Sequence, residues 1–282
     1  MSYSIVTPTK NEGLYIESLI QSVINQEVLP TQWFIMDDGS TDQTQQIIQP
    51  YINQFTFIQY HKLEGFRPDL TNTGGRVAAI INYADDIKTK EIDFIVKMDA
   101  DTSFKPSFFK ELLAEFDRNP QLAVASGHLV ENGVPELIKD RKSGRGANIV
   151  IRYSCFLEIG RFYVSKTRGE DVMCFVACRA KGWQTGTFDY YFNHLKPEGI
   201  RHNELYNHRL TGYYKGSIPY YLPFYLTNLV RDTFKKPYII GSAYQFYGFL
   251  TAYIIHHYRP FPKFVTKQLQ KEQRQKLISL LK

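Results

Sequence analysis

Two aspartates separated by one residue, Asp99 and Asp101, follow the short apolar run Phe94–Met98. Carboxylates with this spacing on a turn can converge on one hard divalent cation, Mn²⁺ or Mg²⁺, which also takes diphosphate oxygens as ligands. The cation would neutralise charge on a departing nucleoside diphosphate. Because Asp-x-Asp is also common in solvated turns, the metal interpretation depends on what else lies at the same place.

Two other residues are candidates for nucleotide contacts. Asp38 lies in the turn-like run DDGS at 37–40, which suits a helix cap, and Asp38 can also accept a hydrogen bond from a base N–H, such as the imide of uracil. Both can hold at once, with Asp37 or Ser40 capping and Asp38 binding. Arg76 follows two glycines at a predicted helix start. There its planar guanidinium and the backbone N–H groups can meet a phosphate, the alternative being an exposed surface arginine.

Asp171 and His194 each have a structural and a chemical interpretation. Asp171 follows Gly169 and Glu170 at a predicted helix start, where the helix dipole favours acids. The chemical alternative is a general base that takes a proton from an acceptor hydroxyl. Spacing alone favours the structural role. His194 lies in the strand-like run 190–195 and is either a satisfied structural histidine, a third metal ligand or a phosphate contact.

The elements that must position these groups alternate along the chain. We expect strands at 3–7, 33–36, 55–60, 94–98, 122–126 and 190–195, and helices at 12–25, 41–51, 75–87, 108–116, 154–162 and 170–181. Strand–helix alternation builds a parallel sheet with helices on both faces, and ligands bind beyond the carboxyl ends of its strands. Polar runs at 8–12, 37–40 and 99–101 follow three predicted strands, so we expect one crevice at this edge.

Five motifs, in this order and spacing, resemble those of the family 2 glycosyltransferases. They are SIVTPTKNEGLYIESLIQSVINQ, MDDGSTDQT, GRVAAIIN, VKMDADTSFKP and GED, and the resemblance covers roughly residues 4–195. It implies an α/β fold of the GT-A type, with a mainly parallel, Rossmann-like sheet that binds a nucleotide-sugar. A mostly helical C-terminal appendage would follow.

The resemblance also implies roles for matching positions. Pro8, Thr9 and Glu12 match the first nucleotide-binding loop, Asp38 the acid that contacts the base, and Arg76 a nucleotide contact; Asp99 and Asp101 match the metal motif, and Asp171 the catalytic base of inverting members. His194 remains a candidate third metal ligand. Lys10 departs from the family, because many members have an aromatic residue there that stacks on the base.

The resemblance predicts an inverting transferase that moves one sugar at a time. The Gln-x-x-Arg-Trp motif of processive synthases is missing after Asp171. UDP is the default donor nucleotide, and the expected acceptor is a glycan or a lipid-linked molecule of the cell envelope. One alternative is an inactive nucleotide-sugar-binding homologue, which would be expected to lose Asp101 or Asp171. The other is a sugar nucleotidyltransferase, whose Gly-rich basic loop after the first strand is not present at 8–12.

Composition and charge divide the chain unevenly. Hydrophobic residues make up 43% and charged residues 22%, which is typical of a packed protein. The formal net charge of +6 resides in residues 257–282, which hold seven Lys and Arg against one acid. A basic tail of this kind is not the basic groove of a nucleic-acid-binding protein, so we expect no nucleic-acid partner. Three cysteines, an odd number, favour a reducing cytoplasm and positions in the core.

We expect a catalytic domain at 1–212, with a nucleotide-binding part at 1–128 and an acceptor part at 129–212. An aromatic and basic helical region would occupy 213–282. This region suits peripheral contact with an anionic membrane, at the inner face of the plasma membrane. The alternative is a helical appendage packed on the catalytic domain with a solvated basic face. The uncharged run Ile239–Ile255 contains polar residues and glycines, so we interpret it as a buried or interfacial helix rather than a membrane span.

Overall fold

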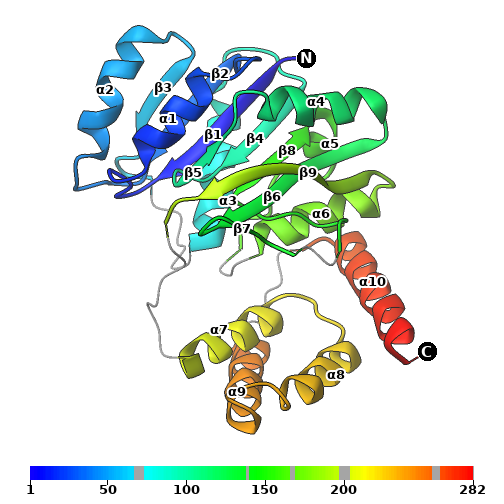
Figure 1. Cartoon of the computed structure of the whole chain (residues 1–282). Coiled ribbons are helices and arrows are strands. Elements are labelled where there is room, and N and C mark those ends of the chain that lie inside the picture. The colour runs from blue at the N-terminus through cyan, green and yellow to red at the C-terminus, as the bar shows by residue number, and fades with distance from the viewer. Residues whose placement is uncertain (67–72, 138–139, 166–168, 197–203, 256–260, 282) are drawn as a thin grey trace.

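The computed structural model describes residues 1–66, 73–137, 140–165, 169–196, 204–255 and 261–281 (Figure 1). Nine strands form one sheet in the order β3-β2-β1-β4-β8-β6-β9-β5, with β7 paired to β6. The strands are β1 Tyr3–Thr9, β2 Gln32–Asp37, β3 Ile58–Lys62, β4 Phe94–Met98, β5 Thr102–Phe104, β6 Leu122–Glu131, β7 Val134–Pro135, β8 Asn148–Arg152 and β9 Gln184–His194. The helices are α1 Ile16–Ile24, α2 Thr44–Gln54, α3 Thr73–Asp86, α4 Phe108–Arg118, α5 Tyr153–Glu158, α6 Glu170–Ala180, α7 Glu204–Ser217, α8 Leu222–Asp232, α9 Ile239–Ile255 and α10 Lys263–Leu281.

The predicted α/β fold is confirmed. Strands β3, β2, β1 and β4 are parallel neighbours, and β6 and β9 form a second parallel pair. The sheet becomes mixed where β8 enters antiparallel between β4 and β6. Strands β5, β7 and β8 were not among the predicted strands. Two of them have only two or three residues, too few to show alternation, and β8 directly follows a stretch that contains Gly133, Gly144 and Gly146.

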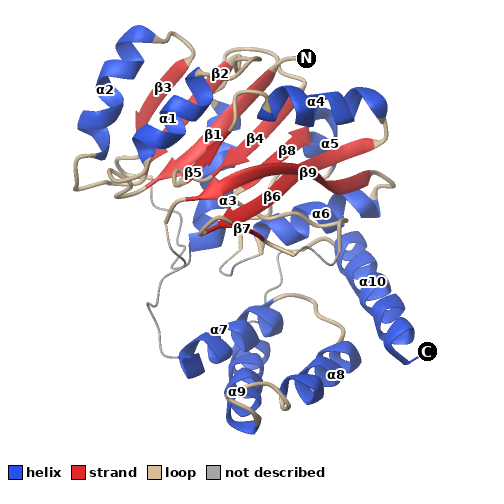
Figure 2. Cartoon of the chain, in the orientation of Figure 1, coloured by secondary structure: helices blue, strands red, loops and turns tan. Residues whose placement is uncertain are grey.

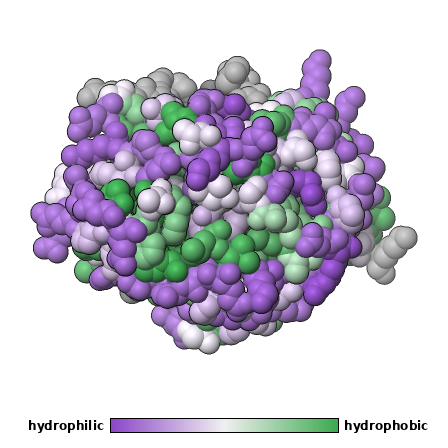
Figure 3. Space-filling view, turned by 90° about the horizontal axis from the view of Figure 1, so that it is seen from above, coloured by the Kyte–Doolittle hydropathy of each residue, from purple (hydrophilic) through white to green (hydrophobic). Residues whose placement is uncertain are grey.

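Helices cover both faces of the sheet (Figure 2). Helices α1, α2 and α4 bury their apolar sides in one core cluster, and α3, α5 and α6 bury theirs in the other. The core strands are buried on both faces and therefore consist of nearly continuous apolar runs. Cys155, Cys174 and Cys178 are all buried and free, as expected of core cysteines. Seen from above, the surface is largely hydrophilic, and its apolar side chains gather in a central band (Figure 3).

The C-terminal region is helical, as predicted. Helices α7 and α9 pack so closely that a Cβ at Gly212 would lie 1.7 Å from the carbonyl oxygen of Gln245. Helix α10 packs on α6, where Val265 and Leu269 join the core and Glu272 pairs with Arg179 at 2.8 Å. It also contacts the start of α8, where the Tyr221 N–H donates to Gln273 Oε1 at 2.6 Å. The predicted domain boundary after residue 212 falls inside α7, and the division into domains stays a prediction. Of the helices within the described ranges, none is both long and apolar enough for a membrane span.

Candidate active site

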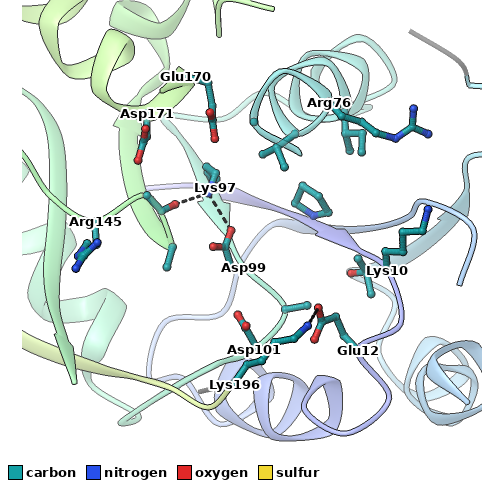
Figure 4. A pocket seen from close by; sticks show the side chains of 18 of the residues that line it. Lys10, Glu12, Arg76, Lys97, Asp99, Asp101, Arg145, Glu170, Asp171 and Lys196 are labelled. Carbon is teal, nitrogen blue, oxygen red and sulfur yellow. Dashed lines mark hydrogen bonds and ion pairs between the residues drawn. The ribbon is translucent and has the colours of Figure 1, made fainter. Parts of the chain in front are cut away.

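A cleft of about 860 Å³ opens at the carboxyl ends of β1, β2 and β4. All nine predicted site residues line it: Pro8, Thr9, Glu12, Asp38, Arg76, Asp99, Asp101, Asp171 and His194. In Figure 4, Arg76 and Lys10 lie on one side of this cleft and Glu170, Asp171 and Arg145 on the other, with Lys97 and Asp99 between them. Sheet order produces this arrangement, because β1 lies between β2 and β4 and brings their ends together.

The loop after β1 is held by the loop after β2. Asn11 has a positive φ of 54°, and its backbone N–H donates to Ser40 Oγ at 3.0 Å. Its side-chain carbonyl accepts a hydrogen bond from the Thr41 N–H at 2.8 Å. The Glu12 N–H donates to Thr44 Oγ1 at 3.0 Å. These bonds fix the backbone of the predicted nucleotide-binding loop against the turn that carries Asp38.

Asp37 and Asp38 have separate environments. Asp37 is fully buried and accepts a hydrogen bond from the Ser40 N–H at 2.7 Å, which closes the turn. It does not cap a helix, because α2 begins only at Thr44 and has no side-chain cap. Asp38 instead lines the cleft and accepts two hydrogen bonds from the Arg76 guanidinium. Arg76 also donates to the carbonyl of Phe66 at 3.1 Å. Arg76 is therefore neither a solvated surface arginine nor an open phosphate contact in this structure, since its planar fork is bound to Asp38.

The sequence interpretation missed Lys97, which lies at the centre of the cleft floor. It is only 4% exposed, and its ammonium group donates to Asp99 Oδ1 at 2.8 Å and to the carbonyl of Gly146. Burial disfavours the charged form of Lys97, but the charges of Asp99 and then Glu170 outweigh this effect and raise its pKa. The sequence does contain an indication of this role, since Lys97 is the one charged residue in the apolar strand FIVKM. A charge buried in such a strand needs a partner of opposite charge or a hydrogen-bond acceptor.

Asp101, directly before β5, and His194, the last residue of β9, lie side by side although the sequence separates them widely. His194 Nε2 is 3.3 Å from Asp101 Oδ2, and the hydrogen bond between them raises the pKa of His194. Asp101 is 8% exposed. Within the described part of the chain, His194 Nδ1 is buried without a hydrogen-bond partner. The two side chains thus present an oxygen and a nitrogen donor to the cleft.

Glu170 and Asp171 begin α6 at the opposite side. Burial raises the pKa of Glu170, and the neighbouring charge of Asp171 raises it further. Gly169 precedes them with a φ of 108°, and a Cβ there would lie 2.5 Å from the ring of Tyr214 on α7. The C-terminal helices therefore contact the turn that positions these acids. Asp171 Oδ1 accepts a hydrogen bond from the Val172 N–H at 2.7 Å, which orients the carboxyl group.

Gly146 has room for no side chain, because a Cβ there would lie 2.3 Å from Asp171 Oδ2. A Gly146→Ala variant must therefore move the Asp171 carboxylate. With Asp171 as the predicted catalytic base, we expect the variant to fold and to lose about 100-fold in turnover, since displacing such a group by about 1 Å has this cost. Steady-state kinetics and thermal unfolding would measure both quantities. Ser143→Ala in the same loop is the control, and equal turnover of the two variants would contradict the expectation.

Comparisons with known proteins agree with this geometry. Two solved structures superimpose on nearly the whole chain. Residues 1–349 of S. aureus TarS superimpose with a TM-score of 0.60 and 16% identity, covering 98% of this chain and 92% of that structure. A mannosyltransferase of Pyrobaculum calidifontis superimposes with a TM-score of 0.59 and 12% identity, covering 99% of this chain and 86% of that structure. The latter was solved with GDP-Man and Mn²⁺. At these identities the likeness shows the fold, which is the GT-A fold predicted from the motifs.

The sequence itself defines the family. Residues 4–182, more than half of the chain, match the family described as glycosyl transferase family 2. The chain therefore belongs to this family. It is 29% identical over 116 residues to an uncharacterised glycosyltransferase of Mycoplasma pneumoniae, covering 40% of this chain and 36% of the relative. It is 31% identical over 121 residues to the poly(ribitol-phosphate) β-N-acetylglucosaminyltransferase TarS of Staphylococcus aureus, covering 42% and 19%. The matches thus span well under two thirds of these relatives.

Proposed function

We propose that this protein is an inverting, non-processive glycosyltransferase that moves one sugar from a nucleoside-diphosphate donor to an acceptor hydroxyl. The observation that carries the proposal is the single cleft. Arg76, a nucleotide-contacting candidate, lies on one side of it and the candidate base Asp171 on the other. Asp38, the second nucleotide-contacting candidate, is hydrogen-bonded to Arg76. A donor that spans this cleft would have its diphosphate over the Asp99–Asp101 turn and its sugar toward Asp171.

The proposed reaction is one in-line displacement at the anomeric carbon. Asp171 takes the proton of the acceptor hydroxyl, the acceptor oxygen forms the new glycosidic bond, and the nucleoside diphosphate leaves with the electrons of the old bond. Attack on the face opposite the leaving group inverts the anomeric configuration. Glu170 is the adjacent acid in the sequence, and burial raises its pKa, which disfavours the ionised form that a nucleophile for a second displacement would need.

The donor atoms of the cleft fit a hard divalent cation, Mn²⁺ or Mg²⁺. Asp101 and His194 lie 3.3 Å apart through Nε2, and the buried Nδ1 of His194 has no hydrogen-bond partner among the described residues. Asp99 is committed to Lys97, and no cluster of three potential ligands forms in the parts of the chain that are described. Diphosphate oxygens and water would complete the coordination. A bound cation would supply charge neutralisation for the leaving diphosphate.

UDP is the proposed donor nucleotide. Asp38, held by Arg76, offers carboxylate oxygens to a base N–H such as the uracil imide. TarS was solved with UDP-GlcNAc, whereas the Pyrobaculum enzyme was solved with GDP-Man, so the fold accepts more than one base. Lys10 lines the same side of the cleft and would not stack on the base as an aromatic residue does.

The proposed acceptor is a glycan or a lipid-linked molecule used in cell-envelope polysaccharide synthesis, at the inner face of the plasma membrane. Support comes from the family and from TarS, whose name states a poly(ribitol-phosphate) acceptor. The nucleotidyltransferase alternative has no support from the family match. An inactive binding homologue is disfavoured because Asp101 and Asp171 both line the cleft.

Calorimetric titration with UDP, GDP, dTDP and CDP, with and without Mn²⁺, tests the proposal. We expect one nucleotide to bind with a Kd on the order of micromolar, and only in the presence of the metal. Nuclear magnetic resonance of the product would then give the anomeric configuration. Failure of the folded protein to bind any of the four would contradict the proposed donor class. Binding without transfer to any envelope acceptor would favour the inactive homologue.

A further inference from the structure

Helix α9 exposes its large apolar side chains and buries small and polar ones, which is the reverse of a surface helix in a water-soluble protein. The residues it buries are small or polar in large part, and they include Gly241, Ser242, Gln245 and Gly248. The residues it exposes are large and apolar: Ile239, Ile240, Tyr244, Phe246, Tyr247, Leu250, Tyr253 and Ile254. A surface helix in water shows the opposite arrangement, with its apolar stripe toward the core. The close packing of α7 on the glycine-containing face explains which side is buried, and leaves the apolar side uncovered.

Helix α8 and the turn after it extend this exposed surface. Leu222, Leu226 and Val230 are exposed on α8, while Tyr225 and Asn228 are buried. Phe234, in the turn, is 79% exposed, and Ile239 at the start of α9 is 73% exposed. In total, 13 of the 25 exposed large apolar side chains in the described ranges lie between residues 222 and 254. Such a concentration is far above the scattered apolar residues of an ordinary surface and marks an interaction site.

Positive charges accompany the apolar surface at the turn between α8 and α9. Arg231, Lys235 and Lys236 flank Phe234, and the one acid among them, Asp232, pairs with Lys235 at 2.9 Å. Lys235 and Lys236 also line a pocket of about 290 Å³ between α7, α8 and α9, whose other charged or ionisable lining residues are His208, Lys215 and the acids Glu204 and Asp232; Gln245 lines it too. Gln245 is 2% exposed, and its amide nitrogen has no hydrogen-bond partner among the residues described. The turn and its pocket therefore offer cationic and N–H donors to an anionic group.

We propose that α8, α9 and the turn between them form a membrane-docking surface, defined by the exposed apolar residues of 222–254 and the cations Arg231, Lys235 and Lys236. Its partner is an anionic phospholipid bilayer. The apolar side chains enter the interfacial region, and the cations face the head-group phosphates. Tyrosine-rich apolar surface beside Lys and Arg is the composition that suits this interface. Because no described helix has the length and apolar character of a span, the helices lie along the surface.

The basic helix α10 is not part of this surface, so the proposed contact lies in the aromatic part of the region 213–282 and not in its basic end. Its Glu272 pairs with Arg179 of α6, and its Lys276 pairs with Asp140 at 2.6 Å. Val265 and Leu269 are buried against the core that contains α6. Helix α10 therefore matches the alternative of an appendage packed on the catalytic domain. The proposed docking does not depend on the transferase activity, although it would bring the cleft near a lipid-linked acceptor.

Vesicle flotation of the full chain tests the proposal. We expect binding to vesicles of phosphatidylcholine mixed with phosphatidylglycerol, and much weaker binding to phosphatidylcholine alone. Phe234→Ser with Ile239→Ser should weaken binding at least about tenfold, because two apolar side chains no longer leave water. Lys235→Gln with Lys236→Gln should weaken it by roughly tenfold or more, since each cation near an anionic surface contributes about fivefold. Leu29→Ser with Leu157→Ser, at exposed apolar sites elsewhere, is the matched control and should bind as wild type.

A second measurement reports insertion directly. The fluorescence of a Phe234→Trp variant should shift to the blue on vesicles and be quenched by brominated lipid, whereas that of Leu29→Trp should not. Absence of vesicle binding at low salt, or binding lost only on replacing Lys267 and Lys271 of α10, would overturn the proposal. So would a dimer in sedimentation that Phe234→Ser dissociates, because a second copy would then cover the surface. Nucleotide titration of the same variants separates these outcomes from a failure of the proposed enzyme function.

Discussion

An Asp171→Asn variant is expected to transfer sugar about 10²–10⁴ times more slowly than the wild-type protein while binding the donor nucleotide almost normally. The amide has the shape of the carboxylate but cannot take a proton from the acceptor. Its oxygen can still accept the hydrogen bond from the Val172 N–H, so the start of α6 should be preserved. Nucleoside diphosphate release in the presence of acceptor measures the rate, and calorimetry measures donor binding.

A Glu170→Gln variant distinguishes Asp171 from Glu170 as the catalytic base. Glu170 adjoins Asp171 and lines the same cleft, and burial raises its pKa, which is the direction expected of a general base, so it is the alternative that this experiment must test. Loss of transfer in Glu170→Gln, with normal turnover in Asp171→Asn, would move the base to Glu170. Loss of nucleotide binding in Asp171→Asn would instead indicate that the substitution disturbs the cleft as a whole.

An Asp101→Ala variant is expected to lose at least about 100-fold in metal-dependent nucleotide binding, since even indirect partners of a metal ligand contribute 10–100-fold to metal affinity. Asp101 and His194 are the two donors that converge in the cleft, at 3.3 Å. Titration of UDP in the presence and absence of Mn²⁺ gives the metal-dependent part as a difference, so residual metal-free binding serves as an internal reference.

Asp99→Asn provides the comparison for Asp101→Ala. The Oδ1 atom of Asp99 is bonded to the buried Lys97, so we expect its replacement to weaken metal binding less than the loss of Asp101. His194→Ala should resemble Asp101→Ala. Equal metal affinity in wild type and Asp101→Ala, with the fold intact by circular dichroism, would remove Asp101 from the metal site and with it the proposed role of the cation.

Local patterns in the sequence predicted most of the fold. The pattern of apolar residues predicted the strands β1, β2, β4 and β6 and the helices between them. A helix or strand that buries one or both faces has apolar residues at the spacing typical of that element, and this spacing can be recognised in the sequence. Very short strands lack this repeat, which is why β5 and β7 were missed. The polar runs after three strands then predicted one crevice, since the ends of parallel strands meet at one edge.

Such patterns could not predict which residues of the cleft contact one another. Asp38 with Arg76, Lys97 with Gly146, and Asp101 with His194 each join distant parts of the chain. Their partners are set by strand order, and β8 and β9 enter the sheet out of sequence order. No local repeat encodes that order. The close approach of Gly146 to Asp171 also depends on two distant segments that meet in the fold. It explains why position 146 has no room for a side chain, which the neighbouring sequence did not show.

The sequence by itself determined that this chain is an α/β protein of a nucleotide-sugar-binding type, with acids at the strand ends and an aromatic, basic C-terminal region. Only the tertiary structure decided which parts of that region are covered. Burial depends on neighbours rather than on composition, so the basic α10 is packed on α6 while the apolar sides of α8 and α9 face outward. The closeness of α7 and α9, which requires glycine on their shared face, is the physical reason that the apolar side of α9 is the exposed one.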